Sequence, residues 1–466
     1  PFPEHSQAPR NVFSCQQTKQ AVGTYSTAYN TRFDTFGYIL NYPQKALTTT
    51  RYKKYTHVDK LPYGVNCIVA IASYGGYNQE DAVILNKSSV ERGMFQNVYF
   101  RSYEDSEECN NGITSTFCNP KYQKNVMNTG TKNYDKLDDN GFIRENVLIT
   151  EDDVYSCKCT RVNTENGEMT KLSGGTIKKN TYGIVDKVVV YENKTGLRTC
   201  KVRVRKNKIP EIGDKFSSRP GQKGVCGMLL TQEDMPYSKD GIVPDLIVNP
   251  HAIPSRMTVN QLLEMILGKS ASVGGFLGDA TPFQNNDIND YTKMLEGYGY
   301  EGNGNEVLYS GITGEQIHTS IFMGPIYYQR LKIQVADKVH SRSTGKMNAL
   351  VRQPVSGRAS GGGFRIGEME RDSIVSHGIS KFMKESVMER SDKYRIQINE
   401  NTGLIDHSDD EKYKVNVELP YAMKLLIQEL QTMSISPRII TNTNINNPDV
   451  FFHMAKEWGP ENAIVY

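Results

Sequence analysis

Three basic residues at regular spacing mark one glycine-rich stretch of the sequence, residues 213–224, which reads GDKFSSRPGQKG. They are Lys215, Arg219 and Lys223. Glycine lets a backbone approach a ligand closely, and ammonium and guanidinium groups neutralise phosphate charge. The stretch therefore predicts a loop that binds an anion, either a nucleotide or a nucleic acid. A solvated loop without a ligand is the plainer alternative.

An acidic pair, Glu80 and Asp81, stands between two apolar runs and is the second group suited to chemistry. The first run, residues 66–73, reads NCIVAIAS and predicts a buried strand. Loops positioned by a rigid scaffold often carry functional side chains, and Mg²⁺ combines few protein carboxylates with phosphate oxygens. One such carboxylate beside Lys215 and Lys223 would form half of a phosphoryl-transfer site. An acidic pair at the surface is the alternative.

Two other stretches resemble nucleotide-binding motifs but lack the required context. Residues 297–302, GYGYEG, match GxGxxG, yet a helical pattern precedes them where a dinucleotide site requires a strand. Residues 268–270, GKS, resemble the end of a P-loop, but Leu263 occupies the position of its leading glycine. Both readings are rejected.

The totals describe a chain of 466 residues with a formal net charge of +3. This length allows two to four domains. No apolar window approaches the roughly 18 residues of a membrane span. Basic residues gather locally: residues 201–223 hold eight Lys or Arg against two acids, which predicts a basic patch. Because the sequence begins with Pro1, we expect it to be the C-terminal piece of a longer protein.

The eight cysteines are scattered, and none forms a CxxC pair. A zinc ribbon is therefore not encoded. Their spacing suits a reducing compartment and predicts no disulfide framework.

The elements that would position these residues can be outlined from the sequence pattern. Residues 100–200, rich in Asp, Asn, Thr and Lys, predict an inserted β-rich subdomain with loops near 104–115 and 160–178. Valines and cations alternate over 199–205, as in a strand. A prolonged loop is expected over 235–256 and a glycine-rich basic loop over 354–367. Helices are expected at 258–268, where Thr258 and Gln261 suggest a capping box, and at 367–389 and 420–433.

Several long motifs, in this order along the chain, are similar to one family. They are PFPEHSQAPRN at 1–11, GGYNQED at 75–81, GDKFSSR at 213–219, GQKG at 221–224, NPHAIPSRM at 249–257 and GEMERD at 367–372. The chain resembles the second-largest, beta-type subunit of multisubunit DNA-directed RNA polymerase in its eukaryotic and archaeal form. The resemblance extends over about residues 1–438.

The resemblance implies a fold of the mixed α+β, multidomain class. Its hybrid-binding domain, with a double-psi β-barrel, would comprise 1–100 and 206–370. A wall or flap would be inserted at 101–205. A helical anchor and clamp segment would follow at 371–440 and a C-terminal extension at 441–466.

The resemblance also implies roles for individual residues. Asp81, next to Glu80, would help to hold a second, nucleotide-borne Mg²⁺. Lys215 and Lys223 would contact the RNA 3′ region and the incoming triphosphate, with Arg10 and Arg256 near its phosphates. Contacts to the RNA–DNA hybrid or other nucleic acid are implied for Lys19, Gln20, Arg219, Gln222, His340, Arg342, Arg352 and Arg358.

The activity implied is template-directed nucleotidyl transfer from nucleoside triphosphates to the RNA 3′ end. The family's tightly held metal requires an aspartate cluster, NADFDGD in the largest subunit, and this sequence has none. The chain would therefore act only in complex with that largest subunit. Its other partners would be small assembly subunits, the DNA template, the nascent RNA and nucleoside triphosphates, and no membrane association is expected. A non-catalytic nucleic-acid-binding scaffold that retains the basic groove is the alternative.

Two departures from the family pattern are visible. Pro220 replaces the usual histidine, which removes an imidazole and a backbone donor. In the clamp, Asn399 and Thr402 replace the first cysteine pair of a zinc site, and His407 is one remaining candidate ligand, so no zinc is expected. The losses and the C-terminal extension suggest a large cytoplasmic DNA virus. We therefore expect an intracellular, reducing location, in host cytoplasm and virion, with the nucleus as the alternative.

Overall fold

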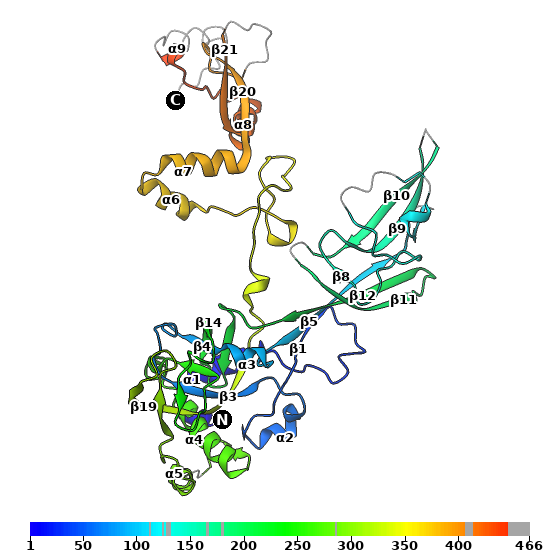
Figure 1. The fold of residues 1–466 in the computed structure, drawn as a ribbon. Coiled ribbons are helices and arrows are strands. Elements are labelled where there is room, and N and C mark those ends of the chain that lie inside the picture. The colour runs from blue at the N-terminus through cyan, green and yellow to red at the C-terminus, as the bar shows by residue number, and fades with distance from the viewer. Residues whose placement is uncertain are drawn as a thin grey trace. The chain divides into compact units, whose positions relative to one another are not determined.

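The computed structural model describes residues 1–110, 113–123, 125–126, 132–164, 167–178, 181–284, 287–405 and 413–445. They belong to two compact units, each described here by itself (Figure 1). The first comprises Pro1–Ile177 and Thr181–Val339, and the second contains the chain from His340 onward. None of the helices in these described ranges is both long and apolar enough to cross a membrane.

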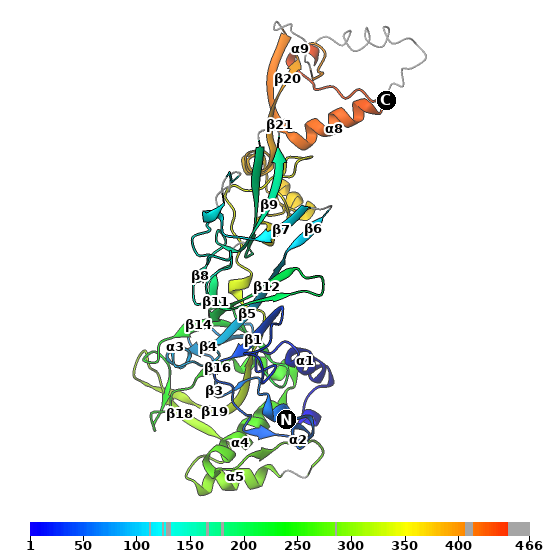
Figure 2. The same ribbon diagram turned by 90° about the vertical axis from the view of Figure 1, so that its right-hand side faces the viewer.

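An eight-stranded mixed sheet forms the centre of the first unit (Figure 2). Its order is β13 (Lys215–Ser218), β14 (Lys223–Leu230), β4 (Ala82–Asn86), β16 (Leu246–Val248), β3 (Val65–Ile71), β19 (Gln316–Arg330), β18 (Asn305–Tyr309) and β15 (Tyr237–Ser238). Because β13 also pairs with β19, the six strands from β13 to β19 close into a ring. The β14–β4 and β16–β3 pairs are parallel.

The interior of this ring is apolar because its strands contribute branched and aromatic side chains to one buried cluster. Val69, Leu85, Phe216 and Tyr328 come from four different strands and belong to one buried cluster. The helix α4 (Val259–Gly274) packs on β19, where a Cβ at Gly268 would lie 2.8 Å from the Pro325 carbonyl oxygen. Beside α4 lies α5 (Ile288–Gly297), visible in Figure 1.

Further elements of this part are short. The N-terminal helix α1 spans Ala8–Thr18. The others are α2 (Tyr52–Thr56), α3 (Lys87–Glu91), the β2–β17 pair (Thr48–Thr49 and Gly278–Asp279), and 3₁₀ turns at Pro3–His5, Val58–Lys60, Pro120–Tyr122, Pro250–Ala252, Pro254–Arg256 and Val335–Asp337.

Two more sheets form a β-rich region that shares a core of its own. One has the order β1 (Phe36–Leu40), β5 (Asn97–Ser106), β12 (Arg198–Lys208), β11 (Gly183–Glu192) and β8 (Leu148–Ile149). The other has β10 (Gly167–Thr176), β9 (Val154–Thr164), β7 (Ile113–Phe117) and β6 (Glu108–Asn110). Phe117 and Cys157 of the second sheet and Val202 of the first belong to one buried cluster. The two sheets therefore pack face to face.

This β-rich character was expected, but two details differ from the prediction. The segments 104–115 and 160–178, expected as loops, lie largely in strands β5 to β7, β9 and β10. Many of their residues are polar and exposed or only partly buried, so they lack the apolar run that marks a buried strand. The structure also pairs Cys118 with Cys159 in a disulfide, where none was expected. The antiparallel pairing of β7 with β9 brings them together across 41 residues of sequence.

The second unit contains α6 (Glu368–Ser376), α7 (Ser380–Lys384), a π-helical segment at Glu385–Asp392, the hairpin β20 (Lys393–Asn399) and β21 (Lys414–Pro420), α8 (Tyr421–Thr432) and α9 (Asn442–Ile445). A 3₁₀ turn at Arg358–Ser360 belongs to it as well. The helix expected at 367–389 is interrupted at Gly378, which has a φ of 70°. The helix expected at 420–433 is confirmed, with Pro420 as its N-cap.

Candidate functional site

The acidic pair lies in the turn between β3 and β4, as the sequence predicted. Glu80 and Asp81 both have left-handed backbone conformations, with φ of 50° and 70°. They are therefore not consecutive strand residues on opposite faces. Residues held in such conformations typically cost of order 1–3 kcal/mol each and cluster at functional sites.

Two glycines of β14 let this turn lie directly against the strand. A Cβ at Gly224 would stand 2.5 Å from the Asp81 carbonyl oxygen, and one at Gly227 would stand 2.2 Å from that of Tyr77. The same Asp81 carbonyl accepts a hydrogen bond of 3.3 Å from the Val225 backbone. The anion loop predicted at 213–224 and the acidic turn are thus adjacent.

Arg256 joins this site from the segment between β16 and α4. Its guanidinium forms an ion pair with the Asp81 carboxylate. It also donates to the Gln222 side-chain oxygen at 3.1 Å. The Arg256 side chain is 19% exposed and that of Asp81 is 40% exposed, so the pair borders solvent. Met257, the next residue, is left-handed with a φ of 53°.

Gln222 is buried and connects the β13–β14 turn to this segment. Its side-chain nitrogen donates to the Ala252 carbonyl at 3.0 Å and to the Thr258 hydroxyl at 2.6 Å. The expected capping box at Thr258 is therefore wrong, because no side-chain hydrogen bond caps α4 and Gln222 uses that hydroxyl instead. The helix also extends beyond Gly268 to Gly274, because Gly268 packs on β19 without ending it.

The helix α1 carries Arg10 to the same place. A Cβ at Gly221 would lie 2.7 Å from the Arg10 carbonyl oxygen, so the helix rests on the β13–β14 turn. Gln17 anchors it further through a hydrogen bond from Ser217. Burial lowers the pKa of Arg10, the positive charge of Arg256 lowers it further, and Asp81 opposes both. Arg10, Arg256 and Asp81 therefore interact electrostatically.

The stretch 213–224, predicted as a loop, is largely the β13–β14 hairpin, because its residues pair with each other and β13 also pairs with β19. Its two lysines share one face of the hairpin. Lys215 pairs with Val225, and Ser217 pairs with Lys223. Alternate residues of a strand point to the same side, so Lys215 and Lys223 are diagonal neighbours with Cα atoms roughly 7–8 Å apart. Phe216, which follows Lys215, and Cys226, which follows Val225, are buried in the core. Lys223 is exposed and Lys215 is partly buried.

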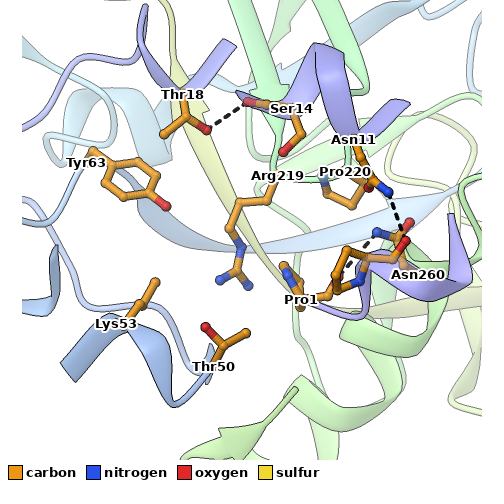
Figure 3. A pocket seen from close by; sticks show the side chains of 11 residues that line it. Pro1, Asn11, Ser14, Thr18, Thr50, Lys53, Tyr63, Arg219, Pro220 and Asn260 are labelled. Carbon is orange, nitrogen blue, oxygen red and sulfur yellow. Dashed lines mark hydrogen bonds between the residues drawn. The ribbon is translucent and has the colours of Figure 1, made fainter. Parts of the chain in front are cut away.

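Arg219 has a different environment from these lysines. It is 7% exposed, forms an ion pair with Glu264 of α4 and donates to the Thr48 carbonyl at 2.8 Å. Arg219 lines a cavity of about 210 Å³. Figure 3 shows its guanidinium between Lys53 and Pro1. The cavity lining is Pro1, Pro3, Asn11, Ser14, Thr18, Thr50, Lys53, Tyr63, Arg219, Pro220 and Asn260. Burial, with a smaller effect of Arg219, lowers the pKa of Lys53 to about 8.

The basic patch predicted for 201–223 is not one surface. Arg203 is buried, forms an ion pair with Asp186 and donates to the Tyr29 carbonyl at 3.0 Å. Lys208 is buried against Asp337. The alternation that suggested an outward row of cations is real, but acidic partners and a neighbouring loop cover part of that row.

The remaining residues expected to bind nucleic acid lie in two places. Lys19 is exposed directly after α1, and the Gln20 carbonyl accepts from Lys332 at 2.9 Å. In the second unit, His340 and Arg342 both bond to backbone carbonyls of the glycine-rich loop, at 2.6 Å each. Arg352 stacks over Tyr421 at 4.4 Å, and Arg358 begins the short 3₁₀ turn.

Metal binding depends on the donor atoms that the side chains bring together. Within the described ranges, no group of three or more His, Cys, Asp or Glu side chains could hold a metal ion. The Asn399 side chain accepts from the backbone of Asn401 and Thr402, so it serves a turn after β20. His407 lies outside the described residues. Asp81 offers a partly exposed carboxylate beside Arg256, which fits a metal that phosphate oxygens and another chain also hold.

Comparison with known families places the chain in a class. The model described as RNA polymerase Rpb2, domain 6, matches residues 1–360, and the one described as RNA polymerase Rpb2, domain 7, matches residues 362–442. The chain belongs to the Rpb2 family of RNA polymerase second-largest subunits, as its motifs indicated.

Individual relatives come from eukaryotes, archaea and a virus. The chain is 46% identical to DNA-directed RNA polymerase II subunit RPB2 of Eremothecium gossypii, over 95% of this chain and 38% of the relative. It is 41% identical to subunit Rpo2 of Saccharolobus solfataricus, over 96% of this chain and 41% of the relative. It is 41% identical to DNA-directed RNA polymerase subunit 2 of Acanthamoeba polyphaga mimivirus, over 96% and 39%. The chain thus spans about two fifths of these relatives.

Proposed function

We propose that this chain is part of the catalytic core of a DNA-dependent RNA polymerase. It would supply half of an active site that transfers a nucleotide from a nucleoside triphosphate to the RNA 3′ end. The supporting observation is that Asp81, Arg256 and the β13–β14 hairpin come together from distant parts of the sequence.

The proposed chemistry is in-line displacement. The RNA 3′-hydroxyl oxygen attacks the α-phosphorus, a new phosphodiester bond forms and the bond to pyrophosphate breaks. Lys215 and Lys223 present ammonium groups from one face of the hairpin, where they would neutralise the triphosphate and position the RNA end. Arg10 and Arg256 would bind the leaving phosphates. Preorganised charge of this kind is the main protein contribution to phosphoryl transfer.

Magnesium would enter this site through Asp81, with Glu80 as its neighbour. When bound, the ion would neutralise charge on the phosphates and stabilise the leaving pyrophosphate. Asp81 now pairs with Arg256, so nucleotide binding would let each side chain exchange a protein partner for the ligand. A partner subunit with an aspartate cluster would supply the other metal ligands.

The domain organisation belongs to the same proposal. The closed six-strand ring supports a double-psi β-barrel within a hybrid-binding domain at 1–100 and 206–370. The paired sheets would be the wall at 101–205, and 371–440 the anchor and clamp, with an extension to 466. Small assembly subunits, template DNA and RNA would be further partners, in an intracellular compartment that is the host cytoplasm and virion for a viral enzyme, or the nucleus otherwise.

Lys223→Ala and Asp81→Ala test this function in the complete polymerase assembled with the largest subunit. We expect each to reduce the rate of single-nucleotide addition on the order of 10²–10³-fold, because each removes a charge that acts in the transition state. Lys239→Ala, in an exposed turn after β15, is the matched control. Wild-type rates in both variants would exclude a catalytic role and favour the scaffold alternative.

A further inference from the structure

A buried carboxylate stands immediately before Lys215 and has no part in the chemistry above. Asp214 is 1% exposed and pairs with Arg330, also 1% exposed, at the end of β19. The distance between the Arg330 Nη2 and the Asp214 Oδ2 is 2.5 Å. Burying such a pair costs desolvation, and apolar residues of similar volume often serve stability as well. The directional hydrogen bonds of this pair therefore indicate a role in holding the backbone geometry around it.

The Asp214 carboxylate bonds to two backbone groups directly and to further backbone carbonyls through the Arg330 side chain. Oδ2 accepts from the Glu211 backbone at 3.1 Å, which closes the turn before β13. Oδ1 accepts from the Val335 backbone at 3.0 Å, where the 3₁₀ turn Val335–Asp337 begins. Arg330 in turn donates to the carbonyls of Phe95 and Lys208 at 2.8 and 2.9 Å.

These bonds fix the start of β13 on both sides of Lys215. The Lys215 carbonyl accepts from Leu331 at 2.9 Å, and Cys226 donates to the Asp214 carbonyl at 2.8 Å. Gly213 has a φ of 94°, and a Cβ there would lie 2.6 Å from the Val335 side chain. The turn is thus packed so closely that the position of Lys215 depends on where the Asp214 carboxylate is held.

We propose that Asp214 is a positioning residue that sets the place of the Lys215 ammonium group through its bonds to Arg330 and Val335. This inference rests on the proposed role of Lys215. Displacing a catalytic group by about 1 Å can cost on the order of 10²-fold in rate, so a change at Asp214 should slow catalysis without removing any group that contacts substrate.

The test uses the complete polymerase with Asp214→Glu, Lys215→Ala and the double variant. Asp214→Glu keeps the charge but moves the carboxylate by one methylene, so Arg330 keeps a partner. We expect a single-nucleotide addition rate about 10–10²-fold lower, and a double variant no slower than Lys215→Ala alone, because residues that act through one another are not additive. Asp240→Glu, at an exposed turn, is the matched control.

Assembly and the unfolding midpoint are measured for the same variants. If Asp214→Glu fails to assemble, Asp214→Asn with Arg330→Gln replaces it, because this pair leaves no buried charge. Independent, multiplicative rate losses, or a lower midpoint with a wild-type rate per assembled complex, would overturn the inference alone. A wild-type rate in Lys215→Ala would overturn the catalytic role of Lys215 together with this inference.

Discussion

Lys223 and Arg219 belong to the same glycine-rich stretch, residues 213–224, yet they have opposite environments. Lys223 is exposed at the start of β14, whereas Arg219 is buried against Glu264 and Thr48. Lys215 and Arg330 form a similar contrast at the base of the hairpin, since Arg330 is held by Asp214. The difference between these exposed and buried residues teaches that the cations around the β13–β14 hairpin have two uses. Some cations border solvent, where we propose that they face a ligand, and others bind the backbone that presents them.

The largest effect is expected at the buried side of this comparison. Glu264→Ala would leave Arg219 buried without its carboxylate, which should lower the free energy of unfolding by about 3–5 kcal/mol. Chemical denaturation of the chain measures it, with the exposed Glu296→Ala of α5 as control. Equal midpoints for both variants would mean that Arg219 finds other partners or water.

The exposed side should respond in rate and not in stability. Arg256→Ala removes a partner of Asp81 at the edge of solvent, so the unfolding midpoint should change little. Single-nucleotide addition by the complete polymerase should fall on the order of 10²-fold, because the arginine would bind the leaving phosphates. A large loss of stability with an unchanged rate would assign Arg256 to the structural group.

The buried Lys53 extends the comparison of buried and exposed cations to the pH dependence of folding stability. Its pKa falls from 10.5 to about 8 in the folded chain, mainly through burial. The unfolded chain therefore binds more protons than the folded one between these values, and the stability contribution rises from pH 8 to 10.5. Relative to Lys53→Met, the wild-type unfolding midpoint should rise as the pH increases from 8 to 10.5. It should fall again as the pH decreases through 8. Parallel pH profiles would contradict the prediction.

The smallest effect is expected for a cation that already has partners. Lys201 pairs with Glu104 at 3.5 Å and lies over the Tyr191 ring at 5.4 Å. Lys201→Ala should leave nucleic-acid affinity and its salt dependence unchanged, whereas Lys223→Ala should reduce the salt slope by about one. Titrations at several salt concentrations distinguish them. A reduced salt slope for Lys201→Ala would indicate that Lys201 also binds nucleic acid and that residues 201–223 form one basic surface after all.

The sequence predicted much of this arrangement, and physical reasons explain the rest. Apolar runs located β3 and β4, and the polar step between them located Asp81, because strand ends are marked by composition. Glu264, Thr48 and Arg330 could not be associated with this stretch from the sequence. The closure of the ring brings Arg330 there, whereas Glu264 comes from α4, which packs on β19, and Thr48 comes from β2. The three-residue β16 was also missed, because prolines on both sides suggested a continuous loop.

The contact between β14 and the acidic turn limits how this protein can vary. Any side chain at Gly224 or Gly227 would overlap a carbonyl oxygen. Neither glycine can therefore be replaced by alanine or serine as an intermediate step toward another residue. A saturation library of both positions, selected for polymerase activity, should return glycine alone, while neighbouring Val225 tolerates many replacements. The distance between the acidic turn and the lysines therefore depends on two positions that have no side chain. Once either position is filled, no single substitution elsewhere can restore that distance.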